Sequence, residues 1–193
     1  LRKSDYEIEK FQKDSQSYFV SCKTSKCIFT TKDSDLFSLD FNLTSIKPVE
    51  MNDKHTEWIT RIVDLGKDRL ATSSGDGTIK IWHIDSETRL TLLSTLRKHT
   101  GGVISILKIR NNEKLVSCSY DNKLIVWDLR NYSIIYEIDG VSCLFVNGIK
   151  ELIRQRIIVA GDNILVVVDC LKGNIIHRIP IETKVTCFEL IND

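Results

Sequence analysis

Two groups of side chains in this chain of 193 residues could carry out hydrolytic chemistry. Each group combines a histidine, a hydroxyl residue, an aspartate and a tryptophan: His55, Thr72, Asp76 and Trp82 in the first, and His99, Ser117, Asp121 and Trp127 in the second. A histidine placed between a hydroxyl and a carboxylate can remove the hydroxyl proton and so create a nucleophile for acyl transfer. The residue types alone therefore allow a hydrolase.

The setting of the two hydroxyls favours a structural role instead. A catalytic triad needs an exposed nucleophile and an oxyanion hole, whereas both hydroxyls lie inside alternating apolar stretches and the whole group occurs twice. The four residue types can satisfy one another. The aspartate accepts from one histidine nitrogen, the other nitrogen accepts from the hydroxyl, and the hydroxyl oxygen accepts from the indole N–H. We predict no catalytic residue.

The six cysteines predict no metal centre. They stand at positions 22, 27, 118, 143, 170 and 187, most of them inside apolar stretches where a reduced cysteine packs as a small hydrophobic residue. Cys22 and Cys27 would need two further ligands to hold zinc, and no second pair stands at suitable spacing. We expect buried, reduced thiols, with zinc or a disulfide as the alternatives. No sequence motif predicts a cofactor, and His177 is expected on a strand face rather than in a metal site.

Charge and hydropathy exclude two classes of partner. Charged residues make up 27% of the chain but the net charge is only +1, whereas nucleic-acid binding needs a clustered excess of lysine and arginine. No apolar run of membrane-spanning length is present and the first residues are polar, so neither a membrane segment nor a signal peptide is predicted. Together with reduced cysteines, these features predict a cytoplasmic or nuclear location. Because the chain starts at Leu1 without a methionine, we expect an excerpt of a longer protein.

The two groups belong to a repeated stretch of sequence, since residues 70–83 reappear in similar form as residues 115–128. Four aspartates mark four registers of this repeat: Asp33, Asp76, Asp121 and Asp162. Six residues later each register reaches the tryptophan position, filled in order by Leu39, Trp82, Trp127 and Val168. A period of about 40–45 residues with a Trp-Asp signature predicts a β-propeller of four-stranded blades.

Period-2 alternation and turn residues predict four strands in each repeat. The predicted strands are 18–22, 27–31, 36–40 and 43–49, then 59–65, 69–73, 78–83 and 89–96, then 103–109, 114–119, 123–128 and 133–138, and finally 141–146, 156–160, 164–169 and 174–179. Single strands at 6–11 and 185–190 would belong to neighbouring blades. We therefore expect one portion of a propeller over residues 1–193, with repeats at about 12–50, 51–97, 98–138 and 139–180 and the first strand of a further blade in 181–193. The turn Gly75-Asp76-Gly77 is expected to use the positive φ angles that glycine tolerates.

Over about residues 12–190 the chain resembles the WD-repeat family of β-propellers, on the residues of the two groups and on the repeated aspartate. The resemblance implies an all-β fold of four-stranded antiparallel blades, an incomplete portion of a larger ring of seven blades. It also implies that each middle blade contains one of the groups as a buried, hydrogen-bonded tetrad. The outer repeats lack a tetrad. Phe29 and Ile158 stand at the hydroxyl position, Leu39 and Val168 at the tryptophan position, and Gly140 near the histidine position of the fourth repeat.

In a propeller of this kind, the loop before the first strand of each blade and the turn between its second and third strands gather on one face. The residues predicted on this rim are Lys32, Thr56, Trp58, Thr100 and Tyr120. Trp and Tyr supply much of the binding energy of protein interfaces, so we expect a non-catalytic protein-interaction scaffold, a module of a larger intracellular protein or complex. Its partners would be other proteins, or further blades from the same parent chain or a partner. The alternative for Trp58 is packing within its own blade.

The opposite face contains a second candidate site. The sequence Trp127-Asp128-Leu129-Arg130 resembles the box of substrate receptors of cullin-RING ubiquitin ligases, in which the arginine contacts the adaptor. A substrate receptor is therefore one alternative function, and a propeller hydrolase is another. The other expectation for Arg130 is a side chain that is solvated or paired with Asp128.

Overall fold

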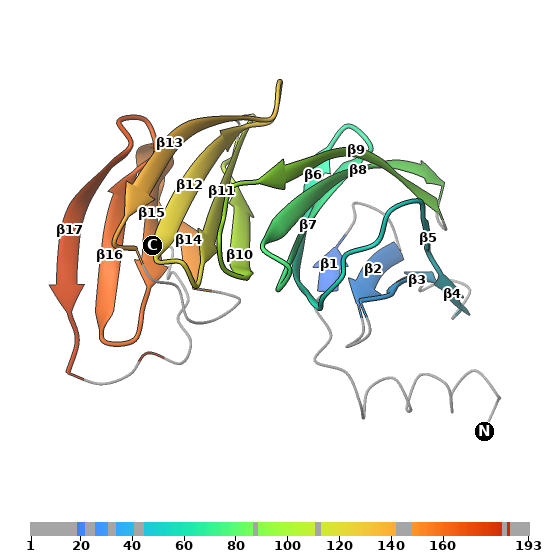
Figure 1. Ribbon diagram of the computed structural model, residues 1–193, viewed down its shortest axis with the longest axis horizontal. Coiled ribbons are helices and arrows are strands. Elements are labelled where there is room, and N and C mark those ends of the chain that lie inside the picture. Colours follow the sequence, from blue (N-terminus) through green and yellow to red (C-terminus); the bar gives the residue numbers. More distant parts are fainter. Residues whose placement is uncertain are drawn as a thin grey trace.

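The structure is a computed structural model that describes residues 19–21, 26–30, 34–40, 45–86, 89–110, 113–141, 148–182 and 185. Within them the chain forms four sheets in sequence order, which confirms the predicted all-β class of antiparallel blades. Figure 1 shows the sheets side by side, from the blue N-terminal strands to the orange and red C-terminal strands, as an open array and not a closed ring. We refer to the sheets as blades 1 to 4.

The four main strands of each blade follow one another in chain order. Blade 1 contains β1 (Phe19–Ser21), β2 (Lys26–Thr30), β3 (Leu36–Asp40) and β4 (Ser45–Pro48). Blade 2 contains β6 (Ile59–Gly66), β7 (Arg69–Ser74), β8 (Thr78–Ser86) and β9 (Arg89–Arg97). Blade 3 contains β10 (Val103–Lys108), β11 (Lys114–Ser119), β12 (Lys123–Asp128) and β13 (Ser133–Asp139). Blade 4 contains β14 (Ile149–Glu151), β15 (Arg156–Ala160), β16 (Ile164–Asp169) and β17 (Asn174–Pro180), with a short 3₁₀ turn, η1 (Ile153–Gln155), before β15.

The structure places the first strand of blade 4 later in the chain than the predicted residues 141–146. The strand that pairs with β15 is β14, in which Ile149 lies opposite Val159. Val141 is instead buried in the core between blades 3 and 4, and its N–H donates to the carbonyl of Asn122 at 3.0 Å. Periodicity cannot distinguish a buried connecting residue from the start of a strand. Residues 142–147 lie outside the described residues, as do the single strands predicted at 6–11 and, except for Val185, at 185–190.

A two-residue strand that the sequence analysis did not predict covers the outer edge of blade 2. β5 (Glu50–Met51) pairs in parallel with β9, and Met51 lies opposite Leu90. Just beyond it, the side-chain oxygen of Asn52 accepts the N–H of Leu92 at 2.9 Å. An open strand edge invites pairing with another chain, so this segment protects β9.

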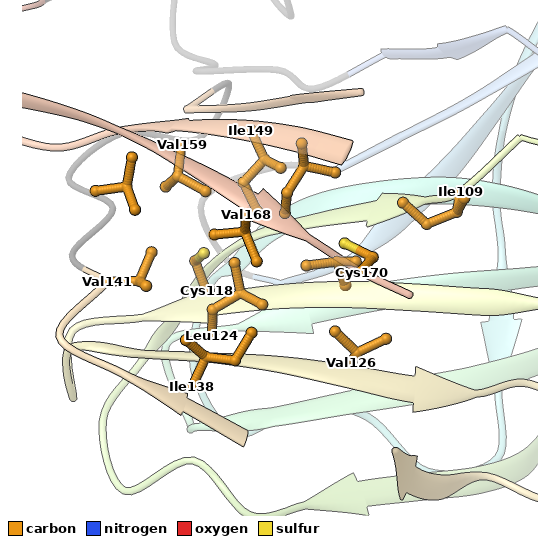
Figure 2. Close-up of a cluster of buried hydrophobic side chains, with 13 residues drawn as sticks. Ile109, Cys118, Leu124, Val126, Ile138, Val141, Ile149, Val159, Val168 and Cys170 are labelled. Atoms are coloured by element: carbon orange, nitrogen blue, oxygen red, sulfur yellow. The ribbon is translucent and has the colours of Figure 1, made fainter. Parts of the chain in front are cut away.

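The blades pack face to face through buried aliphatic side chains. Figure 2 shows the cluster of 13 buried residues between blades 3 and 4, and similar clusters lie between blades 2 and 3 and between blades 1 and 2. In β12, Leu124 and Val126 belong to the cluster toward blade 4, while Ile125 and Trp127 belong to the cluster toward blade 2. This alternation is the period of a strand that is buried on both faces. Each such side chain stabilises the fold by about 1.5–3 kcal/mol.

Two cysteines are buried in the cluster between blades 3 and 4. They are Cys118 and Cys170. Burial raises the pKa of the Cys170 thiol to about 12, so this group stays protonated at neutral pH, and a protonated thiol is a poor nucleophile and metal ligand.

The turn between β7 and β8 differs from the expectation at one of its glycines. Gly77 has the predicted positive φ, at +79°, and Asn122 has the same place in blade 3 with a φ of +60°. Gly75 does not have a positive φ. It is needed for a close approach of Trp58, described below.

Candidate functional site

The structure brings the four side chains of the first tetrad together in blade 2. Trp82 on β8 donates its indole N–H to Thr72 Oγ1 on β7 at 2.8 Å. His55 lies between the other two groups, with Nε2 at 2.8 Å from Thr72 Oγ1 and Nδ1 at 2.9 Å from Asp76 Oδ2. The register explains the first of these contacts. Leu70 is opposite Trp82, so Thr72 lies diagonal to Trp82 on the same face of the sheet.

Blade 3 repeats this arrangement. The indole N–H of Trp127 donates to Ser117 Oγ at 2.8 Å. His99 Nε2 lies 2.8 Å from Ser117 Oγ, and His99 Nδ1 lies 2.8 Å from Asp121 Oδ2. The two tetrads therefore have the same order of partners and nearly the same distances.

The protonation states follow from burial. Burial lowers the pKa of His55 and His99 by more than the neighbouring aspartates raise it. Burial also raises the pKa of Asp76 and Asp121, but hydrogen bonds outweigh it, chiefly from Thr78 to Asp76 and from His99 to Asp121, and both pKa values lie below the ordinary value. A neutral histidine donates Nδ1–H to the charged aspartate and accepts the hydroxyl proton at Nε2.

This geometry gives the tetrad hydroxyls no freedom to act as nucleophiles. Thr72 and Ser117 are both 0% exposed. Each hydroxyl oxygen accepts from an indole N–H, and each hydroxyl proton is directed to a histidine nitrogen. A hydroxyl in this state is satisfied in both directions and out of reach of a substrate. What the tetrad can do is join segments that are distant in the sequence.

The segments that the tetrads join are the loops leading into blades 2 and 3. Besides the histidine, Asp76 Oδ2 accepts the N–H of Thr56 at 3.1 Å. In the same way, Asp121 Oδ2 accepts the N–H of Thr100 at 3.0 Å. Each loop is therefore held against the turn that contains the aspartate, which is the turn between the second and third strands of the blade.

Two serines that the sequence analysis did not single out make a second connection between loop and turn. Ser74 Oγ donates to the carbonyl of Glu57 at 2.9 Å, and Ser119 Oγ donates to the carbonyl of Gly101 at 2.8 Å. The signal was present in the sequence, because a serine stands two residues before the turn aspartate in both middle repeats. Loop and turn are thus fixed by a carboxylate and by a hydroxyl in each blade.

Two of the predicted rim residues are large exposed aromatic side chains. Trp58 is 56% exposed and Tyr120 is 54% exposed. The indole of Trp58 lies over Gly75 and not in the core of its blade, because a Cβ added at Gly75 would lie only 2.1 Å from Trp58 Nε1. The lack of a side chain at Gly75 is therefore what makes room for Trp58.

In both middle blades a backbone N–H of the turn donates to a carbonyl of the loop, but the aromatic residue is in the loop in blade 2 and in the turn in blade 3. In blade 2, the N–H of Gly75 in the turn donates to the carbonyl of Trp58 in the loop at 3.0 Å. In blade 3, the N–H of Tyr120 in the turn donates to the carbonyl of Gly102 in the loop at 3.1 Å. The glycines also meet across the blades, since a Cβ added at Gly102 would lie 3.1 Å from the carbonyl oxygen of Gly75. Trp58 and Tyr120 are thereby linked into one surface.

We call this surface the aromatic rim. It consists of Thr56, Glu57, Trp58, Gly75, Thr100, Gly102 and Tyr120. Thr56 and Thr100 are exposed there, as is Glu57, which the sequence analysis did not select although it stands between two predicted rim residues. Lys32, the remaining residue predicted on the rim, lies outside the described residues.

At the other end of blade 3, Arg130 is paired with Asp128. Its Nε donates to Asp128 Oδ1 at 2.9 Å and its Nη2 to Asp128 Oδ2 at 2.5 Å, while the side chain stays 76% exposed. The hydrogen bonds from Arg130 lower the pKa of Asp128 to about 2. Asp169 has the same place in blade 4, where its carboxylate accepts the N–H of Leu171 at 2.9 Å. The aspartate at the end of the third strand thus closes the turn to the fourth.

Blade 4 replaces the tetrad hydroxyl with a valine, at a different residue from the one predicted. In blade 3, Ser117 pairs with Ile125, and the corresponding pair in blade 4 is Val159 with Val166. Val159 therefore stands at the hydroxyl position, and Ile158 does not. The difference arises because β15 has 5 residues where β11 has 6, so that counting back from the turn aspartate is wrong by one position.

Three further observations concern metal binding, membrane crossing and His177. Over the described ranges, no group of three or more His, Cys, Asp or Glu side chains is placed to hold a metal ion. In the same part of the chain, no helix is long and apolar enough to cross a membrane. His177 is exposed on β17, opposite Val167, and so lies on a strand face.

The match to a known family model lies in the two middle blades. The family model described as WD domain, G-beta repeat, matches residues 47–83 and 90–128. Nuclear distribution protein PAC1 of Komagataella phaffii is 45% identical over 75 residues, which are 38% of this chain and 15% of that protein. Protein transport protein SEC13 of Candida albicans is 40% identical over 68 residues, 34% of this chain and 23% of that protein. Target of rapamycin complex subunit wat1 of Schizosaccharomyces pombe is 28% identical over 125 residues, 64% of this chain and 38% of that protein. The aligned part of this chain therefore spans well under half the length of each relative.

Proposed function

This chain belongs to the WD-repeat family of β-propellers, and we propose that it is a non-catalytic scaffold that binds other proteins through the aromatic rim. The observation that carries the proposal is the pair of aromatic side chains on the rim, Trp58 and Tyr120, each more than half exposed and each seated opposite a glycine. Aromatic side chains bury a large area on binding and lose little conformational entropy.

The rim is a suitable binding surface because it is held in place before a partner arrives. The tetrad aspartates and the two serines fix both loops through the backbone and leave the aromatic side chains outward. A partner then has no loop to order on binding, and the entropic cost of association is smaller.

The names of the relatives are consistent with this role. One is a subunit of a target of rapamycin complex, and the other two are named for nuclear distribution and for protein transport. None of these names describes a catalysed reaction. A module of a larger cytoplasmic or nuclear assembly is the function that we infer for this chain.

The experiment is capture of partner proteins by the immobilised chain from an extract of cells that contain it. We expect Trp58→Ala and Tyr120→Ala each to weaken capture of the main partner by about 1–3 kcal/mol, the cost of truncating an aromatic side chain central to an interface. The melting temperature should stay near that of the unchanged chain, because both side chains are largely exposed.

Two variants on the opposite face provide the matched controls. Leu171 is an exposed apolar residue in the turn after β16, and Arg130 occupies the corresponding turn of blade 3. Leu171→Ala and Arg130→Ala should leave capture unchanged. Loss of partners with Arg130→Ala alone would contradict the proposal and favour the substrate-receptor alternative, in which that face contacts an adaptor.

A further inference from the structure

The aromatic rim holds a carboxylate beside an indole. A Cβ added at Gly75 would lie 2.1 Å from Trp58 Nε1, 2.5 Å from Trp58 Cδ1 and 2.7 Å from Glu57 Oε2. Neighbouring residues of an extended chain normally point to opposite sides. Here the two side chains reach the same glycine, so they lie side by side on the surface.

The carboxylate of Glu57 is uncompensated within the described part of the chain. Glu57 is exposed, and no ion pair or side-chain hydrogen bond joins its carboxylate to another described residue. The lysines of the two rim loops are already occupied. Lys54 Nζ lies 2.6 Å from Asp35 and Lys98 Nζ lies 3.2 Å from Glu137. Among the described residues, the rim therefore offers a negative charge without an ion-pair partner next to an aromatic ring.

This combination suits a cationic ligand, and a guanidinium better than an ammonium. The face of an indole attracts a cation, and it does so most strongly for tryptophan among the aromatic side chains. A carboxylate matches the planar fork of a guanidinium, which can also stack on an aromatic ring, whereas an ammonium is a compact and strongly hydrated charge.

Tyr120 enlarges the same site toward blade 3. Its backbone N–H is bonded to Gly102, and Gly102 lies against the backbone of Gly75 beneath Trp58. A ligand that places a cation at Glu57 and Trp58 can therefore extend its chain over a second exposed ring. A peptide segment fits this arrangement, and an isolated ion does not use it.

We propose that the aromatic rim binds an arginine side chain in an exposed segment of a partner protein, with the guanidinium against Trp58 and paired with Glu57. This inference rests on the proposed function, because it names the chemistry of the partner at the same surface. It distinguishes Glu57, the charged member of the rim, from the aromatic residues that would bind any apolar partner.

The test uses short glycine-serine peptides with one central arginine, lysine or citrulline, whose affinity for the full chain is measured by calorimetry. Citrulline has the shape of arginine without its charge. We expect the arginine peptide to bind about tenfold more tightly than the citrulline peptide, a factor in the range of a cation–π contact together with an exposed ion pair. The lysine peptide should lie between them, and added salt should weaken the arginine peptide most.

The site of binding can be read from fluorescence. Trp82 and Trp127 are 0% and 3% exposed, so Trp58 is the tryptophan that acrylamide can quench. The arginine peptide should protect it from quenching. Glu57→Gln should weaken the arginine peptide about threefold to tenfold and leave the citrulline peptide unchanged. Asp68→Asn is the matched control, because it removes one exposed charge from the turn between β6 and β7 on the opposite face.

Citrulline or lysine binding as tightly as arginine would overturn the inference, as would Glu57→Gln without effect on the arginine peptide. These failures can be told apart from a failure of the proposed function. If partner proteins are lost with Trp58→Ala but retained with Glu57→Gln, the rim binds proteins by other contacts and only the arginine site is wrong. If Trp58→Ala and Tyr120→Ala both retain all partners, the scaffold proposal itself is wrong.

Discussion

Blades 3 and 4 share one strand register but differ in what fills the equivalent buried positions. Ser117 and Trp127 of blade 3 correspond to Val159 and Val168 of blade 4. The serine is bonded to both the tryptophan and His99, whereas the two valines belong to the aliphatic cluster of Figure 2. Both blades nevertheless form four antiparallel strands. The tetrad is therefore not needed to make a blade.

In blade 3 the tetrad attaches the loop before β10 to the turn between β11 and β12. His99 and the N–H of Thr100 both belong to the loop before β10, and both are bonded to Asp121 in the turn between β11 and β12. Aliphatic packing can hold strands together, but it has no direction and cannot fix a loop to one atom of a turn. The exposed aromatic residues Trp58 and Tyr120 lie in the two blades that have a tetrad.

The largest effect in this comparison is expected from removing the tetrad hydroxyl of blade 3. Ser117→Ala leaves two buried groups without a partner, the indole N–H of Trp127 and Nε2 of His99. We expect a loss of about 2–6 kcal/mol in the free energy of unfolding, since each of the two stranded buried groups costs about 1–3 kcal/mol. Chemical denaturation measures this loss.

The matched variant in blade 4 is Val159→Ala. It removes buried methyl groups but strands no polar atom, so a loss of about 1–2 kcal/mol is expected. If Val159→Ala destabilises the chain as much as Ser117→Ala, the tetrad contributes no more than ordinary packing and the distinction between the blades fails.

A smaller difference is expected between the aspartates of the two turns. Asp121→Ala removes the acceptor of His99, of Thr100 and of the N–H of Lys123, so it should destabilise the chain by about 1–3 kcal/mol. Asp162, the corresponding residue of blade 4, has no tetrad histidine to hold, and Asp162→Ala should cost less. The melting temperatures of the two variants measure this difference, and equal decreases would contradict the prediction.

The strands could be predicted from the sequence more completely than the connections between them. Strand bounds agree within three residues wherever alternation is flanked by turn residues, because period 2 is imposed by the geometry of the strand itself. The first strand of blade 4 was predicted too early in the chain, since it is β14 and Val141 is buried without being in a strand. The sequence analysis also missed β5, because a strand of two residues is too short to show alternation and its pairing with β9 cannot be seen in the sequence. Burial and long-range pairing depend on partners that are distant in the sequence.

The candidate site was predictable in its residue types but not in its contacts. The aromatic residues Trp58 and Tyr120 follow from the repeat register, and the structure places both on an exposed surface. In blade 2 the aromatic residue is in the loop and the glycine in the turn, whereas in blade 3 the two are reversed. This reversal could not be predicted from one repeat alone. The position of Glu57 beside Trp58 depends on both side chains turning over Gly75, and a sequence pattern contains no information on that direction.

Acid should weaken the two blades that contain a tetrad. Burial lowers the pKa of His55 and His99 in the folded chain, so the unfolded chain binds more protons below about pH 6.5, the ordinary pKa of histidine. The stabilisation is therefore complete above this pH and is lost as the pH falls toward the folded pKa. The slope for each histidine is at most about 1.4 kcal/mol per pH unit, the value for a difference of one bound proton. The lowered pKa values of Asp76 and Asp121 act only at lower pH.

Denaturation between pH 7 and pH 5 measures this slope, and a variant without one titrating group provides the control. His99→Asn should reduce the slope by about half in that range, because His55 still titrates. A free energy of unfolding that does not change between these pH values would mean that folding does not lower the pKa of the tetrad histidines.

The smallest effect on stability, and the sharpest test of the rim, is expected from the glycine beneath Trp58. In Gly75→Ala the new methyl group would meet Trp58 Nε1 and Glu57 Oε2, which are ends of exposed side chains that can turn away. The free energy of unfolding should change by less than about 0.5 kcal/mol. Capture of partners and binding of the arginine peptide should nevertheless fall, because the indole and the carboxylate no longer lie side by side.

Gly102→Ala is the matched control. Its methyl group would meet the carbonyl oxygen of Gly75 at 3.1 Å and its Cα at 3.2 Å, so the backbones of two blades must move apart and stability should fall more. Melting temperature and acrylamide quenching of Trp58, measured on both variants, separate the two roles. If Gly75→Ala lowers the melting temperature as much as Gly102→Ala, then Trp58 is clamped as part of the blade and is not free to serve as a binding surface.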